Sequence, residues 1–452
     1  MTSTHRTTPG ARAWIEALAS DFVELAGYAA WPAGYAGPLD WPGYAEQLER
    51  ASERSGQTES VVCGQATVGG VPAVLIAFDF RFLGGSVGQQ TGERIERAFS
   101  VARRARQPVV SLIATGGSRM QEGMRSLRQL TRLARECQLT RAAGVPHVAV
   151  LGNPTTGGLW AALGAGADVV LALADAEVGF AGRRVRSPAD VDHPAFTSED
   201  HWASGQVDQV VTESELPSVL SRWLDLLRPA DQHALPEPAD VPRALGRTEL
   251  PPDGWTAVRW ARDPDRPRAP AYLDDYFQTR VALSGDRVGG VDPGMWCGIG
   301  RRDGRAIAYA AQTGTANTPA GFRTAARLIQ LADRFTLPVL TLVDTPGADN
   351  SGAAERAGLG PALAELFGAV AGARVPITTL VIGEGGSGGA LALAHPDRTW
   401  ITPDGYFSVI APEASAAILK RGPDQVAATA DQLRLRPQDL VELGVVRGIS
   451  RG

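Results

Sequence analysis

An internal repeat constrains the fold of this chain more than any other feature of its sequence. Three segments of the first half recur in the second half, in the same order: Pro108–Gly117 with Pro338–Gly347, Gly144–Leu151 with Arg374–Val381, and Thr156–Leu163 with Ser387–Ala394. The spacing is 230 residues for the first two pairs and 231 for the third. Three matching segments at nearly one spacing indicate a duplicated unit, so we expect two related domains.

A proline-rich segment separates the two copies. Arg228–Gly254 contains six prolines among charged and small residues, a composition typical of an extended surface linker. We therefore predict domains at residues 1–227 and 255–452, joined by a linker at residues 228–254.

Each copy reads as alternating strands and helices. Val109–Ala114 and Val339–Val343 are short β-branched runs that follow a proline and lead into a glycine-rich turn, as buried strands do. Gln121–Ala142 and Ala353–Ala371 have the composition of helices. This order predicts an α/β fold in which helices cover the sheets.

Composition excludes several classes of protein. A net charge of -5 argues against a nucleic-acid surface, which would show a basic stripe. The three cysteines are too far apart for a disulfide framework or a zinc ribbon, and no apolar run is long enough to span a membrane. The first 30 residues do not read as a signal peptide. We therefore expect a cytoplasmic protein with no membrane, nucleic-acid or metal site.

Four glycine-rich turns follow predicted strands: Thr115–Arg119, Thr156–Gly158, Asp344–Gly347 and Gly383–Gly389. Glycine lets a ligand approach the main chain, and two backbone N–H groups can stabilise charge that develops on a carbonyl oxygen. Each turn alone is explained as well by close packing of a helix on a strand. Their recurrence in both copies, without an evident side-chain catalyst, favours a site built from backbone amides. Neither a Rossmann fingerprint nor a P-loop is present.

Two sets of motifs are specific enough to indicate a family. The first set is Phe82–Gly88, Gly116–Glu122, Asn153–Gly158 and Val178–Gly182. The second set is Asp344–Ala348, Glu355–Arg356, Val381–Leu391 and Tyr406–Glu413. The first resembles the β subunit of the bacterial acetyl-CoA carboxylase carboxyltransferase, and the second resembles the α subunit. The resemblance covers residues 25–227 and 262–449.

This resemblance implies a fold and a reaction. The fold would be two tandem domains of the ClpP/crotonase type, each a spiral of ββα units. The reaction would move a carboxyl group from carboxybiotin on a carrier protein to the α-carbon of an acyl-CoA such as acetyl-CoA. The product, malonyl-CoA, would serve fatty acid or polyketide synthesis. In this family the site forms between the N-terminal half of one protomer and the C-terminal half of another, which implies a homo-oligomer, a dimer or a hexamer.

The resemblance also implies the residues of the site. Backbone amides would hold the thioester oxygen and the ureido oxygen of biotin, at Gly157 and Gly158 in one half and at Gly388 and Gly389 in the other. The candidates for substrate binding are Gly116, Gly117, Arg119 and Ala390.

The single lysine bears on the partners. Lys420 is the only lysine beside 43 arginines, and it lies in Ala-Ala-Ile-Leu-Lys-Arg rather than in the Met-Lys-Met turn of a biotin carrier. The resemblance therefore implies a separate biotin carboxyl carrier protein and a separate biotin carboxylase. No metal is expected, because the zinc ribbon that begins the bacterial β subunit needs four cysteines and residues 1–50 contain none.

A departure from the family pattern leaves other functions open. Where the α subunit has a basic Lys-Gly-Arg cluster, this chain reads Gln312–Pro319 without a cation. One alternative is a decarboxylase of a malonyl thioester, and another is a non-catalytic homologue. Asp344 and Glu384 are interpreted as structural acids near the glycine turns, and the histidines show no metal-ligand spacing.

Overall fold

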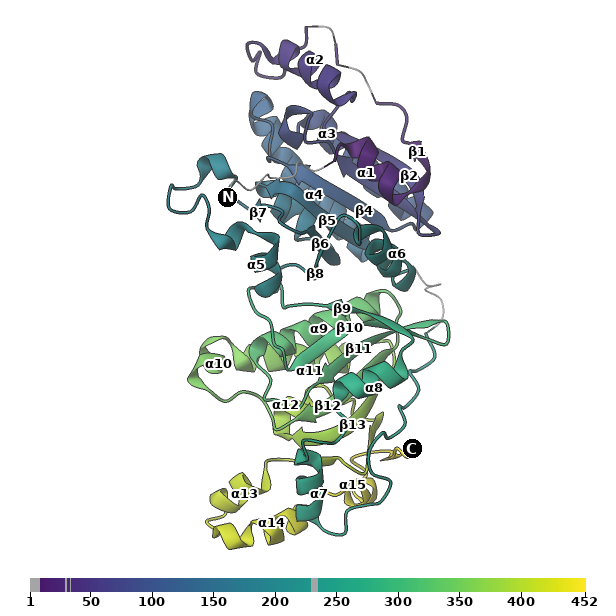
Figure 1. Cartoon of the computed structure of the whole chain (residues 1–452), viewed down its shortest axis with the longest axis vertical. Helices are drawn as coiled ribbons and strands as arrows, with labels where there is room; N and C mark the ends of the chain where they lie inside the picture. The colour runs from purple at the N-terminus through teal and green to yellow at the C-terminus, as the bar shows by residue number, and fades with distance from the viewer. Residues whose placement is uncertain (1–8, 29–30, 33, 229–234) are drawn as a thin grey trace. The chain divides into compact units, whose positions relative to one another are not determined.

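The structure is a computed structural model, which describes residues 9–28, 31–32, 34–228 and 235–452. The chain divides into two compact units, Met1–Ala230 (unit 1) and Asp231–Gly452 (unit 2) (Figure 1). Within the described residues, no helix is both long enough and apolar enough to span a membrane.

Unit 1 is one mixed sheet with helices packed on it. Its strands are β1 (Ser20–Glu24), β2 (Val61–Val68), β3 (Val71–Phe78), β4 (Val109–Thr115), β5 (His147–Thr156), β6 (Val169–Leu173), β7 (Val178–Gly179) and β8 (Gln209–Val211). Its α-helices are α1 (Ala11–Leu18), α2 (Tyr44–Ser55), α3 (Gln89–Ala105), α4 (Gly123–Ala142), α5 (Ser198–Ala203) and α6 (Leu216–Leu226). Its short 3-10 and π-helical segments are η1 (Leu83–Gly85), η2 (Met120–Glu122), η3 (Trp160–Gly164), η4 (Arg183–Val185) and η5 (Pro194–Phe196).

Unit 2 repeats this architecture. Its strands are β9 (Thr279–Leu283), β10 (Met295–Arg302), β11 (Arg305–Gln312), β12 (Val339–Thr345), β13 (Ile377–Gly386), β14 (Thr399–Ile401), β15 (Tyr406–Ser408) and β16 (Gly448–Ile449). Its helices are α7 (Gly254–Arg262), α8 (Ala269–Tyr276), α9 (Pro319–Arg334), α10 (Gly352–Arg356), α11 (Leu359–Gly372), α12 (Ser387–Leu391), α13 (Pro412–Ile418), η6 (Pro423–Gln425), α14 (Val426–Gln432) and α15 (Pro437–Glu442).

The two sheets have the same strand order. Unit 1 runs β1-β2-β3-β4-β5-β6-β8 with β7 on β5, and unit 2 runs β9-β10-β11-β12-β13-β14-β16 with β15 on β13. In each, an antiparallel hairpin leads into parallel strands, so the carboxyl ends of the parallel strands lie at one edge. The predicted duplication and helix-covered α/β fold are therefore present.

The bounds of equivalent strands correct the predicted spacing of the third repeated segment. Strands β5 and β13 start and end 230 residues apart, and the backbone leaves each strand at a residue with positive φ, +83° at Gly157 and +54° at Ser387. Gly157 therefore corresponds to Ser387, and Gly158 to Gly388. The sequence comparison placed this third pair at a spacing of 231 because it matched the two Gly-Gly dipeptides letter by letter, and the structure shows that this alignment was wrong by one residue.

Apolar side chains from helix and sheet build the core of unit 2. Ala269, Tyr272 and Leu273 of α8 pack on β12 and β13 through Leu342 and Ile382. Burying such side chains stabilises the unit by roughly 1.5–3 kcal/mol each. This packing fixes the strands whose carboxyl ends carry the glycine-rich turns.

Residues 235–253 lie in the stretch predicted as a linker. They form neither helix nor strand, and they pack on unit 2. Ala239 is buried in the α8 core, and the Ser450 hydroxyl donates to the carbonyl of Pro242 at 2.6 Å. Arg247 forms ion pairs with Asp263 at 2.7 Å and Asp404 at 2.8 Å.

Candidate active site

The same backbone turn follows the fourth strand of each unit. In unit 1, the hydroxyl of Thr115 accepts the N–H of Gly117 at 3.0 Å and donates to the carbonyl of Gly85 at 2.7 Å. In unit 2, the hydroxyl of Thr345 accepts the N–H of Gly347 at 3.1 Å and donates to the carbonyl of Thr315 at 2.8 Å. A threonine thus locks this turn in both copies. Sequence analysis did not assign it a role, although the threonine recurs at a spacing of 230.

The glycines of unit 1 meet at the carboxyl edge of its sheet. The N–H of Gly116 donates to the carbonyl of Gly84 at 2.8 Å. A Cβ on Gly157 would lie 2.8 Å from the Cα of Gly117, so the two turns touch through their backbones. Only residues without side chains allow this approach, which explains why the turns are glycine-rich.

The amides predicted for unit 1 are not equally available. The N–H of Gly157 donates to the carbonyl of Gly179 at 3.1 Å, and the amides of Gly116 and Gly117 are also bonded within the chain. Within the described residues, no acceptor lies on the N–H of Gly158 or of Leu159, which begin the turn after β5. The unbonded donors of this unit therefore include Gly158, one of the residues expected at the site, and Leu159, a buried residue that the sequence did not indicate.

Unit 2 presents the corresponding amides on α12. Within the described residues of unit 2, no acceptor lies on the N–H groups of Gly388 and Gly389; Gly388 is half-buried, and Gly389 and Ala390 are buried. A Cβ on Gly389 would lie 2.4 Å from the backbone nitrogen of Ala348, so α12 rests directly on the turn after β12. Gly388 is open, with no atom within 4 Å of its Cβ position.

Arg119 belongs to a buried ion-pair network of unit 1. Its side chain is fully buried and pairs with Glu59 and with Glu122, the latter at 3.2 Å. The Tyr44 hydroxyl donates to the same Glu122 at 2.7 Å. Burial by itself would raise the pKa of Glu59, but the charge and hydrogen bonds of Arg119 outweigh burial and hold that pKa below its usual value. With no exposed surface, this guanidinium acts as a buried ion-pair partner, and its prediction as a substrate ligand lacks support.

A second charged network lies behind the glycine turn of unit 2. Asp344 is fully buried and pairs with Arg266 at 2.6 Å and with Arg268 at 3.3 Å. Burial raises the pKa of Asp344, and the two guanidinium groups oppose that rise. Glu384 accepts from Arg262 at 2.9 Å and from the Tyr406 hydroxyl at 2.8 Å. Both acids therefore have arginine partners, in keeping with the structural roles predicted for them.

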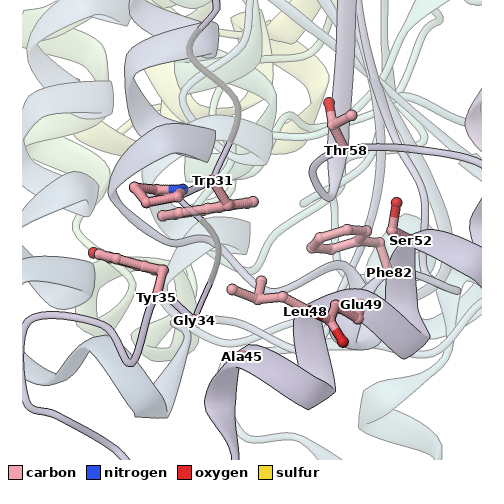
Figure 2. Close-up of a pocket in the computed structure, with 10 residues that line it drawn as sticks. Trp31, Gly34, Tyr35, Ala45, Leu48, Glu49, Ser52, Thr58 and Phe82 are labelled. Carbon is pink, nitrogen blue, oxygen red and sulfur yellow. The ribbon is translucent and has the colours of Figure 1, made fainter.

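A cavity of unit 1 lies apart from these amides. It has a volume of about 210 Å³ and lies between α2 and the residues Trp31, Pro32, Gly34 and Tyr35, as Figure 2 shows. Its lining includes Trp31, Tyr35, Leu48 and Phe82, and the first two rings stack at 4.7 Å. Among the described residues, no group of three or more His, Cys, Asp or Glu could hold a metal ion.

Comparison with known proteins now gives the family. Residues 252–451 match the family described as acetyl co-enzyme A carboxylase carboxyltransferase-like, and residues 40–201 match the carboxyl transferase domain. The chain is 39% identical to the acetyl-coenzyme A carboxylase carboxyl transferase subunits beta/alpha of Saccharopolyspora erythraea, over 92% of its own length and 76% of that protein. This chain belongs to the acetyl-CoA carboxylase carboxyltransferase family.

Other relatives agree with this assignment. The chain is 40% identical to the beta/alpha subunits of Salinispora arenicola, over 92% of its length and 77% of that protein. It is 32% identical to a probable biotin-dependent acyl-coenzyme A carboxylase beta3 subunit of Mycobacterium bovis, over 89% of its length and 82% of that protein. These matches confirm the predicted family and its acyl-CoA carboxyltransferase activity.

Solved structures confirm the crotonase-like fold. A transcarboxylase 12S crystal structure, a hexamer with methylmalonyl-coenzyme A bound, superposes with a TM-score of 0.77 at 20% identity, covering 98% of this chain and 87% of the other. A single-chain, multi-domain long-chain acyl-CoA carboxylase superposes with a TM-score of 0.76 at 21% identity, covering 98% of this chain and 44% of the other. At these identities the likeness shows the fold alone.

Proposed function

We propose that the chain transfers a carboxyl group between biotin, held on a separate carrier protein, and an acyl-CoA such as acetyl-CoA. The family assignment supports the reaction class. The observation that carries the site is that, among the described residues, no acceptor lies on the N–H groups of Gly388 and Gly389, on a helix packed against the turn after β12. Biotin would supply the carboxyl group and the base, so the chain itself needs to provide only binding and charge stabilisation.

The amides would act on the oxygen that becomes negative. When the α-carbon of an acyl-CoA loses a proton, charge moves onto the thioester oxygen, and two fixed N–H donors stabilise it. Loss of one such donor costs about 3–4 kcal/mol in well-studied oxyanion holes. We assign stabilisation of the thioester oxygen to the amides of Gly388 and Gly389 in unit 2. We assign stabilisation of the ureido oxygen of biotin to the amides of Gly158 and Leu159 in unit 1.

The remaining glycines and Ala390 would shape these sites without donating. Gly116, Gly117 and Gly157 have amides bonded within the chain, and their lack of side chains would give a substrate access to the main chain. Ala390, which is buried, would hold α12 on the sheet. Only the open amides are therefore assigned to catalysis.

The proposed partners follow from the reaction. A biotin carboxyl carrier protein and an ATP-using biotin carboxylase would supply the carboxyl group, and the reaction would take place in the cytoplasm. A homo-oligomer, a dimer or a hexamer, would complete the site, since amides of both units are needed.

The exposed face of helix α11 supports association. This helix has a single charged residue, and Phe367 on it is 40% exposed. Its other exposed residues include Gly360, Ala364, Gly368 and Ala371.

Carboxyl exchange tests this proposal. The purified chain is incubated with biocytin and with malonyl-CoA, methylmalonyl-CoA or a longer carboxyacyl-CoA, and loss of the carboxyacyl-CoA is followed. Consumption that requires biocytin supports a biotin-dependent transferase, and the preferred substrate gives the acyl length. Consumption at the same rate without biocytin would indicate a thioester decarboxylase, and no consumption of any substrate would favour a non-catalytic homologue.

A further inference from the structure

Helix α12 is too short to fix its own geometry. It spans five residues, Ser387–Leu391, and an isolated helix of that length is unstable in water. At its end, the N–H of Ala392 bonds to the carbonyl of Gly388 at 2.9 Å and the N–H of Leu393 to that of Ala390 at 3.2 Å. The carbonyl of Gly389 is instead bonded by a side chain, the amide of Gln312, at 3.0 Å.

Gln312 joins α12 to the neighbouring strand. It is the last residue of β11 and has no exposed surface. Its Oε1 accepts the backbone N–H of Asp344 in β12 at 3.3 Å, while its Nε2 donates to the carbonyl of Gly389. The N–H of Asp344 can only donate and the carbonyl of Gly389 can only accept. The two bonds together therefore determine the orientation of the Gln312 amide.

Backbone contacts with the turn after β12 also restrict α12. Gly389 lies so close to the turn after β12 that a Cβ would be 2.4 Å from the nitrogen of Ala348 and 2.7 Å from the carbonyl carbon of Gly347. The first turn of α12 is therefore held by backbone contact with the turn after β12 and by the hydrogen bond from Gln312. Displacement of reacting groups by about 1 Å can cost 100-fold in rate.

Unit 1 has no glutamine at the position equivalent to Gln312. The paired residues Ala308 and Val339 of unit 2 correspond to Val74 and Val109 of unit 1, which places Phe78 at the position of Gln312. Phe78 is fully buried and apolar. The fold thus accepts a hydrophobic residue here. Burying an amide instead costs free energy unless both of its bonds form, so the glutamine is explained better by what it holds than by packing.

We propose that Gln312 is a positioning residue, which sets the amides of Gly388 and Gly389 through its bond to the Gly389 carbonyl. This inference rests on the proposed function, because those amides are the assigned donors. Gln312 acts only through α12, so its loss should lower kcat and leave the KM for the carboxyacyl-CoA nearly unchanged.

The test is biocytin-dependent consumption of malonyl-CoA by Gln312→Met, which keeps the size of the side chain and removes both hydrogen bonds. We expect kcat to fall about 10- to 100-fold and KM to change less than about twofold. The matched control is Gln129→Met. That glutamine is also buried and bonds a backbone carbonyl, that of Arg125, at 2.9 Å. A melting temperature is measured for each variant, and the control should lose stability without losing kcat per folded molecule.

A second variant separates positioning from general stability. In Gln312→Glu, a buried carboxylate would face the Gly389 carbonyl, and protonation would restore a donor. We expect its kcat relative to wild type to be lowest at about pH 8 and to recover as the pH falls towards about 6, since burial raises the pKa of a carboxyl. Wild-type kcat in both variants, or an equal loss in Gln129→Met, would overturn the inference alone. A wild-type chain inactive with malonyl-, methylmalonyl- and longer carboxyacyl-CoA would overturn the proposed function and the inference with it.

Discussion

Arg119 shows how a motif can conceal the role of a residue. It lies in the glycine-rich segment that resembles the β subunit, beside two glycines that looked suited to a substrate. Its partner Glu59 lies 60 residues earlier in the chain, and the sequence gives no sign that the two meet. Ion pairs over such distances depend on tertiary structure, so the position of Arg119 could be predicted from the sequence but its role could not.

Replacement of Arg119 should therefore affect stability first. In Arg119→Met, the buried carboxylates of Glu59 and Glu122 lose their cation, and the free energy of unfolding should fall by about 3–5 kcal/mol. Urea unfolding measures the loss. Arg184→Met, at an exposed arginine of η4, serves as the control and should change stability by less than about 0.5 kcal/mol. A stable Arg119→Met with a raised KM for acyl-CoA would show instead that this arginine binds substrate.

His147 should make unit 1 sensitive to mild acid. Burial lowers its pKa to about 4, while Asp168 opposes and Arg141 adds to that change. Its Nε2 lies 2.9 Å from the Ser111 hydroxyl. Because the unfolded chain binds the proton near pH 6.5, the stability contributed by the neutral ring is complete above that pH and is lost as the pH falls towards 4.

The replacement His147→Gln tests this pH dependence. Urea midpoints of the wild type should decline between about pH 7 and pH 4.5, and those of the variant should decline less. His201 and His395, whose pKa values are also lowered by burial, keep part of the slope in the variant. Equal slopes in the two proteins would contradict the assignment.

At the scale of elements, the location of the glycine-rich turns could be predicted from the sequence, but their backbone conformation and hydrogen bonds could not. Recurrence of Gly-Gly indicated the turns, and the family resemblance then suggested Gly158, Gly388 and Gly389 as candidate donors. The sequence could not show that the amide of Gly157 is already bonded, nor that Ser387 takes the left-handed backbone which a glycine has in the other copy. The first fact depends on the pairing of β7 with β5, and the sequence comparison contains no information on that pairing.

The contact between α12 and β12 predicts the effect of a single methyl group. In Gly389→Ala, the new Cβ would collide with backbone atoms that no rotamer change can move, so α12 must shift and carboxyl transfer should fall at least 10-fold. Gly448→Ala is the matched control, because its Cβ would meet only Trp400 at ordinary contact distance. Steady-state kinetics of both variants with malonyl-CoA and biocytin compare them. Full activity in Gly389→Ala would mean that this contact does not position the site.

At the scale of the whole molecule, duplication was the strongest inference from sequence. The two sheets have the same strand order, which confirms the duplication. The spacing of strands along the chain is retained even where the individual side chains differ. The second copy has nevertheless acquired its own features. Gln312 stands where the first copy has Phe78, and residues 235–253 pack against unit 2 although their prolines predicted a linker. Such differences arise from contacts that a comparison of repeats does not contain.

At the same scale, the proposed function requires that each unit supplies amides and that neither supplies the base. If biotin provides the base, the chain alone should leave malonyl-CoA intact, and added biocytin should start its decarboxylation. The most direct measurement is the rate of malonyl-CoA loss as biocytin is titrated into the purified chain. We predict a rate near zero without biocytin, which rises to saturation as biocytin is added. A rate that is independent of biocytin would contradict the account.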